Sequence, residues 1–367
     1  MDQKFKVILD HFDIPEELVD AAPIGNGMIN DTLAVTVRTP GGATEEKYIL
    51  QRINNHVFED VDTLQSNIFS VTKHIRKKLQ TEGDRDIDRH VLTFFPTKSG
   101  APYHRHSDDT YWRLSLYIKG SKTYETVTPA LAREAGKAFG AFQSHLADLP
   151  SHNLGETIPR FHDMAFRLDE LHQAIQADRA GRVAEVRDLI AEIEKRSSDM
   201  LLQDKLHAEG KLPKRINHLD TKVNNILFDA HSDKVLCVID LDTVMPGYVL
   251  SDIGDFIRTA VNTAAEDEED LSKVGVNMEI FHAYTEGYME GARDFLTPTE
   301  ISLLPYGGRL LTYMQTVRFL TDYLNGDIYY KTAKPKHNLI RAKAQFEFLR
   351  KLEEKAQEMD TFMERWL

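Results

Sequence analysis

The segment that decides the fold reads HLDTKVNN at residues 218–225 and, after a polar turn, IDLD at residues 239–242. Asn225 follows Asp220 by five positions, and Asp240 follows Asn225 by fifteen. This H-x-D-x-x-x-x-N pattern, with an aspartate at the end of the next apolar run, is typical of enzymes that transfer phosphoryl groups. The surrounding apolar runs supply the strand and loop context that such a motif requires.

Phosphoryl transfer requires a carboxylate near the attacking hydroxyl, oxygen ligands for Mg²⁺ and a cation that balances charge on the moving group. We therefore predict that Asp220 orients the hydroxyl and accepts its proton, and that Lys222 contacts the γ-phosphate of ATP. Asn225 and Asp240 are the predicted magnesium ligands. Asp242 either binds a second metal ion or hydrates the end of the strand, and the sequence favours neither alternative.

The bulk properties of the chain restrict the class of protein. A length of 367 residues predicts two subdomains with a ligand cleft between them. The composition, with 41 % hydrophobic and 28 % charged residues, is typical of a globular protein. The formal net charge of −13 argues against nucleic-acid or membrane partners and favours small-molecule substrates. A single cysteine, Cys237, allows no intrachain disulfide. Charged residues throughout the first twenty positions argue against a signal peptide, and no apolar run is long enough to cross a membrane. We therefore expect a cytoplasmic protein.

The first third of the chain reads as strands and one helix. Residues 31–37 and 47–53 predict a hairpin around Gly41-Gly42, and residues 61–79 carry apolar side chains at helical spacing. Residues 112–118 predict the last strand of this part, which leads into a linker. These features predict an amino-terminal nucleotide-binding lobe over residues 1–118.

The rest of the chain reads mainly as helices. Thr128 and Pro129 predict the start of a helix that ends before Pro150, and residues 339–352 form one amphipathic stripe. The exception is a predicted hairpin of residues 225–228 and 235–239. This pattern predicts an α/β (α+β), two-lobed fold with a catalytic and substrate-binding lobe over residues 119–367, and the phosphoryl-transfer motif at residues 218–225 favours the protein-kinase-like type.

A resemblance to a known family rests on short runs of residues spread over nearly the whole chain. They are Asp220 to Lys222, Asn225 to Leu227, Ile239 to Thr243, Met245 to Gly247, Arg318 to Leu320, Asp322 to Leu324, Gly326 to Tyr329, Gly25 to Gly27, Ile29-Asn30, Tyr48 to Gln51 and Phe161 to Asp163. With these runs the chain resembles the aminoglycoside phosphotransferase superfamily, and within it the bacterial N-acetylhexosamine 1-kinases. The resemblance implies phosphorylation of the anomeric hydroxyl of N-acetylglucosamine or N-acetylgalactosamine with ATP and Mg²⁺.

Two other interpretations remain open. The chain could act on an aminoglycoside, choline or homoserine within the same superfamily, although a cationic acceptor usually needs an acidic pocket and Arg318 argues against one. It could also be a non-catalytic protein that binds a nucleotide or a sugar. The intact Asp220, Asn225 and Asp240 argue against that alternative. No pattern in the sequence specifies an oligomeric state.

The predicted nucleotide site begins at a glycine turn. Gly25, Gly27 and Asn30 precede the first strong strand, where backbone N–H groups of a kinase cover phosphate oxygens. The third strand, which carries a lysine in most kinases, lacks one here. Gln51 or the following Arg52 could contact the phosphates instead, and strand alternation lets one of the two point inward.

The adenine-binding segment is inferred from its position in the fold. Leu116, Tyr117 and Ile118 follow the last predicted strand of the first lobe. A linker at this place would hold adenine through its backbone.

The predicted acceptor site contains the polar residues that follow the metal motif. A neutral sugar is held by polar side chains that fork onto adjacent hydroxyls. The helical spacing of Arg318 and Asp322 is compatible with an exposed salt-bridged face or with a sugar site, and the family resemblance favours the sugar. Asp327, Tyr329 and Asp255 are further candidates. A brace for the catalytic loop is the role expected of Asp252.

Overall fold

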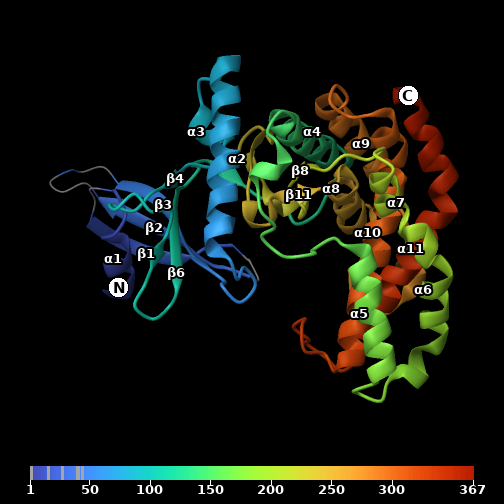
Figure 1. Cartoon of the computed structure of the whole chain (residues 1–367). Coiled ribbons are helices and arrows are strands. Elements are labelled where there is room, and N and C mark those ends of the chain that lie inside the picture. Colours follow the sequence, from blue (N-terminus) through green and yellow to red (C-terminus); the bar gives the residue numbers. More distant parts are fainter. Residues whose placement is uncertain (1–2, 15–16, 26–28, 39–41, 43–44) are drawn as a thin grey trace. The chain divides into compact units, whose positions relative to one another are not determined.

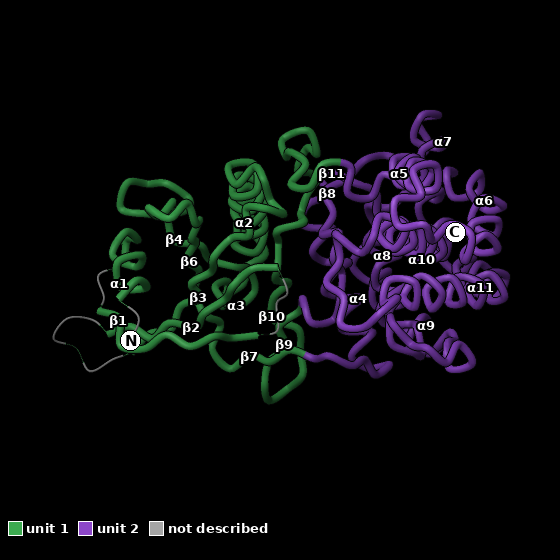
Figure 2. Tube along the Cα trace, turned by 90° about the horizontal axis from the view of Figure 1, so that it is seen from below, with its two compact units in different colours: residues 1–123, 148–159, 226–245 green, residues 124–147, 160–225, 246–367 purple. Residues whose placement is uncertain are grey.

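The computed structural model describes residues 3–14, 17–25, 29–38, 42 and 45–367 (Figure 1). The described chain forms two compact units (Figure 2). Unit 1 contains residues 1–123, 148–159 and 226–245, and unit 2 contains residues 124–147, 160–225 and 246–367. The units interleave along the sequence, and the division at residue 118 into two functional lobes stays a prediction.

Unit 1 is built on an antiparallel sheet with the strand order β1-β2-β3-β6-β4, with β5 paired to β6. The strands are β1 (Glu17–Pro23), β2 (Asp31–Arg38), β3 (Glu45–Ile53), β4 (Phe94–Phe95), β5 (His104–Arg105) and β6 (Tyr111–Leu116). The predicted hairpin is confirmed, because β2 and β3 pair in continuous register from Asp31 opposite Arg52 to Arg38 opposite Glu45.

One face of this sheet carries the hydrophobic core of unit 1. Val35, Leu50 and Leu114 have no exposed surface, and together with Trp112 they pack near the short helix α1 (Gln3–Leu9). Residues that alternate with them on β2, β3 and β6 point to the opposite face. Gln51 on β3 and Arg113 on β6 belong to that opposite face.

Helices α2 (Val61–Glu82) and α3 (Ile87–His90) also belong to unit 1. The predicted helix over residues 61–79 is confirmed and continues for one further turn. The Asp60 side chain caps its first turn by accepting from the Thr63 N–H, and Gly83 ends it with a φ of 78° that suits glycine.

A second sheet of unit 1 has the order β10-β9-β7. Its strands are β7 (Ser121–Lys122), β9 (Ile226–Asp229) and β10 (Val235–Val238). The antiparallel pairing of β9 with β10 confirms the predicted hairpin. Asp240 follows β10 with a φ of 57° and leads into a short 3₁₀ turn.

Unit 2 is mainly helical. Its helices are α4 (Pro129–Leu146), α5 (Met164–Ala177), α6 (Arg187–Met200), α7 (Leu202–Ala208), α8 (Val249–Phe256), α9 (Met278–Ala292), α10 (Pro298–Asn325) and α11 (His337–Met363). A short ladder joins β8 (Arg215–Asn217) to β11 (Met245–Gly247), which starts at the last residue of unit 1. The predicted cap at Thr128 is confirmed, since its hydroxyl accepts from the Leu131 N–H at 3.3 Å. Within the described ranges no helix is long and apolar enough to cross a membrane.

Helices α4 and α9 approach each other through small residues. Gly136 and Gly140 on α4 lie against the backbone of α9, and Gly287 and Gly291 on α9 lie against the backbone of α4. A Cβ atom added at Gly287 would overlap the carbonyl oxygen of Arg133. The two G-x-x-x-G runs therefore allow a backbone-to-backbone contact that other residues would prevent.

Candidate active site

Asp252 holds the loop that carries Asp220. Asp252 lies on α8. Its Oδ2 accepts a hydrogen bond from the His218 N–H at 2.9 Å, and its Oδ1 accepts one from the Leu219 N–H at 2.7 Å. Gln143 donates to the same Oδ2 at 2.7 Å. Leu219 has a φ of 64°, an unfavourable value for a leucine, so these hydrogen bonds offset backbone strain. The brace predicted at Asp252 therefore has a physical basis.

The buried position of Asp252 predicts a pH dependence of stability. Burial raises the pKa of this carboxyl to about 6, whereas an unfolded chain would have a value near 3.8. Between these pH values the folded protein binds the additional proton, so stability falls as pH rises. We expect the free energy of unfolding, relative to Asp252→Asn, to decrease by roughly 2 to 3 kcal/mol between pH 4 and pH 7.

Denaturant titrations of both proteins at several pH values would measure this difference. The Asp252→Asn variant is the matched control because an amide of the same shape does not titrate. A difference that stays constant between pH 4 and pH 7 would contradict the assignment.

Asp220 is held by two groups of its own loop. Lys222 Nζ lies 2.7 Å from Oδ1, and Asn225 Nδ2 donates to Oδ2 at 2.9 Å and to the Asp220 carbonyl oxygen at 2.8 Å. Burial alone would raise the pKa of Asp220, but attraction to Lys222 and the hydrogen bonds lower it below the usual value. Asp220 is therefore ionised at neutral pH and suited to align a hydroxyl group.

The orientation of Asn225 fits a role as a magnesium ligand. Its amide nitrogen donates to Asp220, and within the described part of the chain its carbonyl oxygen accepts no hydrogen bond. Asp240 is exposed at the end of β10. Mg²⁺ bound to nucleotide phosphates needs only one or two protein oxygens, so the lack of any three-residue cluster among the described residues is compatible with such a site.

Asp242 has a different environment from Asp240. It is buried, and its Oδ1 lies 2.5 Å from Arg113 Nη1 while its Oδ2 accepts from Asn30 Nδ2 at 2.5 Å. Both oxygens therefore have protein partners within unit 1. The role of Asp242 as a second metal ligand stays a prediction, and Arg113 is a buried cation that no motif in the sequence indicates.

The structure shows which of Gln51 and Arg52 on β3 points inward. Gln51 accepts from Arg113 at 2.9 and 2.6 Å and donates to the Thr32 hydroxyl at 2.9 Å, whereas Arg52 pairs with Asp31 on the surface. Gln51 is therefore the inward residue of the two.

The other predicted nucleotide residues also lie in unit 1. Gly25 has a φ of 76°, and Gly27 lies outside the described residues. Leu116 ends β6, and Ile118 is buried against Leu236 and Cys237. The Ile118 carbonyl accepts from the Ser121 hydroxyl at 2.7 Å. Contact of these residues with a nucleotide stays a prediction.

Arg318 lies between two aromatic rings. Its guanidinium is 5.4 Å from the centroid of Phe161 and 5.6 Å from that of Tyr330, and it donates to Gln315 at 3.2 Å. These contacts hold a cation and two aromatic faces together in unit 2.

His162 stacks on Phe161, with ring centroids 4.4 Å apart. Desolvation, followed by repulsion from Arg318, Arg167 and Arg258, lowers the pKa of His162 to about 3, against the attraction of Asp220. The ring is therefore neutral, and its Nδ1 is buried without a partner among the described residues. No pattern in the sequence indicates a role for this histidine.

Asp322 braces a loop from inside unit 2. It is buried, and its oxygens accept from the N–H groups of residues 328, 329 and 330 and from Asn338 Nδ2 at 2.8 to 2.9 Å. Asp322 is therefore not part of an exposed salt-bridged helix face, which was one of the two interpretations of its helical spacing. Asp327 pairs with Arg182 at 2.6 Å, and Tyr329 is 66 % exposed.

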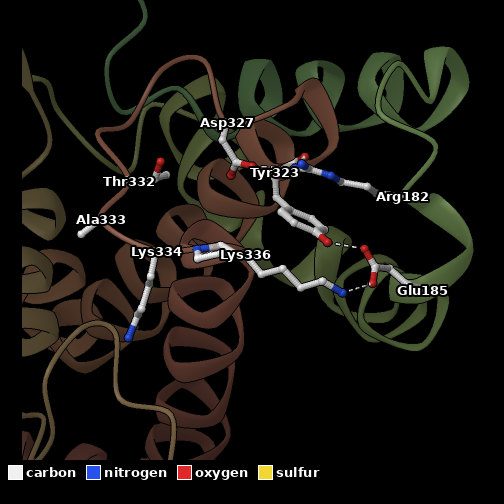
Figure 3. Close-up of a pocket in the computed structure, with 9 residues that line it drawn as sticks. Arg182, Glu185, Tyr323, Asp327, Thr332, Ala333, Lys334 and Lys336 are labelled. Atoms are coloured by element: carbon white, nitrogen blue, oxygen red, sulfur yellow. Dashed lines mark hydrogen bonds and ion pairs between the residues drawn. The ribbon is translucent and has the colours of Figure 1, made fainter.

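Asp327 also lines a surface pocket of about 590 Å³ (Figure 3). Arg182, Glu185, Tyr323 and residues 332–336 complete its lining. Lys336 lies 2.6 Å from Glu185, and the Tyr323 hydroxyl also contacts that carboxylate, so the charged groups of this wall neutralise one another.

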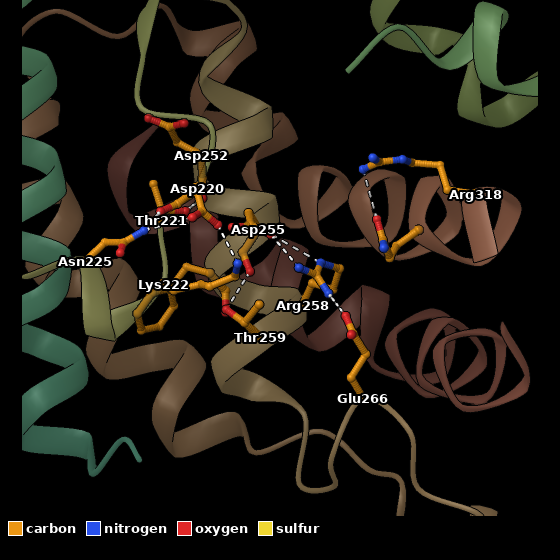
Figure 4. Close-up of polar contacts among 12 residues, drawn as sticks. Asp220, Thr221, Lys222, Asn225, Asp252, Asp255, Arg258, Thr259, Glu266 and Arg318 are labelled. Carbon is orange, nitrogen blue, oxygen red and sulfur yellow. Dashed lines mark hydrogen bonds and ion pairs between the residues drawn. The ribbon is translucent and has the colours of Figure 1, made fainter. Parts of the chain in front are cut away.

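Asp255 is buried on α8. Its Oδ1 accepts from Arg258 at 3.2 and 2.9 Å, and its Oδ2 has no donor in the described part of the chain. Arg258 also pairs with Glu266 at 2.7 Å. The structure thus brings Asp220, Lys222, Asp255 and Arg258 into one region of unit 2 (Figure 4).

A sheet-rich unit, a helical unit and a braced Asp220 loop together define a phosphotransferase of the kinase-like class. The profile of the phosphotransferase enzyme family matches residues 20–288. The chain therefore belongs to the phosphotransferase enzyme family.

Several solved structures are similar over almost the whole chain. A microcompartment-associated aminopropanol kinase has a TM-score of 0.57 at 16 % identity, and 98 % of each chain is covered. Choline kinase from Cryptosporidium parvum Iowa II has a TM-score of 0.56 at 12 % identity over 95 % of this chain and 92 % of that one. An aminoglycoside 2′-phosphotransferase bound to GDP has a TM-score of 0.54 at 11 % identity, covering 98 % and 100 %. The predicted kinase-like fold is therefore confirmed.

Proposed function

We propose that this chain is an ATP-dependent kinase that phosphorylates the anomeric hydroxyl of N-acetylhexosamines to give sugar 1-phosphates. Asp220 is the observation that carries the proposal. Its carboxylate is ionised, is fixed by Lys222 and Asn225, and belongs to a loop that Asp252 braces. Such a group aligns an acceptor hydroxyl and accepts its proton as the phosphoryl group arrives.

The other parts of the reaction use residues of the Asp220 loop and the aspartate that follows β10. Asn225 and Asp240 are the proposed oxygen ligands of Mg²⁺, which when bound balances charge on the phosphates of ATP. Lys222 balances charge next to Asp220. An anomeric hydroxyl is more acidic than an ordinary alcohol, so the proton transfer to Asp220 is easier for a free sugar.

The charges near Arg318 support a neutral acceptor. Burial is the main cause that lowers the pKa of His162 and keeps its ring neutral, and repulsion from Arg318, Arg167 and Arg258 adds to it. Such surroundings disfavour a cationic acceptor, whereas aromatic faces, a neutral imidazole and a guanidinium suit sugar hydroxyls and an acetamido group. The family resemblance, rather than these charges, supplies the N-acetylhexosamine.

An ATP-consumption assay over a panel of acceptors tests the proposal. We expect turnover with N-acetylglucosamine or N-acetylgalactosamine and none with choline, aminopropanol or an aminoglycoside. NMR of the product should place the phosphate on the anomeric carbon. Turnover with a cationic acceptor and none with the sugars would contradict the assignment.

A variant at Arg318 tests the proposed acceptor site directly. Arg318→Met should raise the KM for the sugar about 10- to 100-fold and leave the KM for ATP unchanged, because it removes charge-assisted hydrogen bonds. Arg350→Met is the matched control, since Arg350 is exposed on α11 and pairs with Glu347. An unchanged KM for the sugar in Arg318→Met would remove Arg318 from the site.

A further inference from the structure

A buried ion pair lies on the face of the unit 1 sheet opposite its hydrophobic core. Arg113 on β6 and Asp242 are joined at 2.5 Å, and their side chains are only 4 % and 3 % exposed. Burial of two charges is unfavourable unless each has good partners. Arg113 meets this condition, because two further N–H groups, on Nε and Nη2, donate to Gln51 Oε1 at 2.9 and 2.6 Å.

Arg113 lies next to the strand position that carries a lysine in most kinases. In the antiparallel register Arg113 lies directly opposite Gln51, so both side chains lie on the same face of the sheet. Gln51 occupies the strand position where most kinases carry a lysine. The cation missing from β3 is therefore present one strand away and reaches the same region.

The partner of this cation is also unusual. Kinases usually pair the strand lysine with a glutamate on the following helix. Here Asn67 of α2 instead donates to the carbonyl oxygens of Gly155 and Val244 at 2.8 and 2.9 Å. Asp242 supplies the negative charge.

Asn30 connects this ion pair to the predicted phosphate-binding turn. Its Nδ2 donates to Asp242 Oδ2, and its Oδ1 accepts from the Asn54 N–H at 2.9 Å. Asn30 therefore ties the end of the Gly25 to Asn30 run to Asp242. Lys222, the other candidate cation, is paired with Asp220 in unit 2.

We propose that Arg113 is the phosphate-binding cation of the nucleotide site and replaces the strand lysine of other kinases. This inference rests on the proposed kinase function. Asp242 and Gln51 hold the guanidinium in place when no nucleotide is bound. Nucleotide phosphates then gain a charge-assisted hydrogen bond from Arg113, whereas the adenosine moiety does not depend on it.

Calorimetric titration with ADP and with adenosine tests this inference without any sugar. We expect Arg113→Met to weaken ADP binding about 10- to 100-fold and to leave adenosine binding unchanged. Adding Gln51→Lys to Arg113→Met returns a cation to the same face from the opposite strand, and it should recover most of the ADP affinity. Arg52→Met is the matched control, because Arg52 is the strand neighbour that pairs with Asp31 on the surface.

The possible results of these titrations test the role of Arg113 separately from the proposed kinase function. Unchanged ADP affinity in Arg113→Met, or equal losses for ADP and adenosine, would overturn the role of Arg113 while leaving the kinase proposal intact. A double variant that binds adenosine but recovers no ADP affinity would also overturn it. An unaltered protein that binds no nucleotide would refute both. If Arg113→Met does not fold, Arg113→Met with Asp242→Asn removes both charges and serves in its place.

Discussion

Asp220→Asn is expected to lower kcat about 10²- to 10⁴-fold, the range measured for removal of a general base. The amide keeps the shape of the side chain, but it cannot accept the proton of the acceptor hydroxyl. It also loses the attraction to Lys222, which lies 2.7 Å from the carboxylate. Nucleotide affinity should be preserved, since Arg113 and Asn30 are unchanged.

Steady-state kinetics with the sugar, together with titration of ADP, would measure this separation. Asp233→Asn is a suitable control because Asp233 lies in the exposed turn between β9 and β10. Turnover like that of the unaltered protein would refute the role of Asp220 as the base. A parallel loss of ADP binding would instead indicate that the substitution disrupted the fold.

Gly287→Ala is expected to destabilise the protein by about 3 kcal/mol, the upper end of the usual range for overpacking. The added methyl group would overlap the Arg133 carbonyl, which is backbone and cannot rotate away. Helices α4 and α9 would have to separate, and the contacts along both G-x-x-x-G runs would loosen together.

Thermal and urea denaturation would measure the loss of stability. Glu290→Ala on the same helix is the matched control, since this exposed side chain pairs with Arg133 at the surface and should contribute no more than about 1 kcal/mol. Equal stability of Gly287→Ala and the unaltered protein would show that the two helices can move apart without cost.

The features that sequence predicted best are local ones. The contact of Asn225 with Asp220 spans five residues, and the β2–β3 and β9–β10 hairpins join neighbouring strands. Their formation depends on alternation, turn residues and short loops, all of which are visible in the sequence. Thr128 likewise caps the helix that begins one residue later.

The features that sequence could not predict depend on distant pairings. Arg113 and Asp242 are 129 positions apart, and no periodicity indicates that an arginine within an apolar strand has a buried partner. His162 lacks a motif of its own, and its neutral state arises first from burial and then from repulsion by arginines that are mostly distant in sequence. The helical spacing of Asp322 indicated a polar face, but the chain folds back so that its carboxylate binds three backbone N–H groups.

The interleaved course of the chain limits how this protein can be divided. The backbone passes between the two compact units at residues 123/124, 147/148, 159/160, 225/226 and 245/246. A fragment that ends at Thr123 would lack β9, the strand that pairs with β7, and would leave Arg113 buried without the carboxylate of Asp242. Neither unit is an exchangeable module, so recombination with relatives would have to transfer three separate segments at once to keep unit 1 intact.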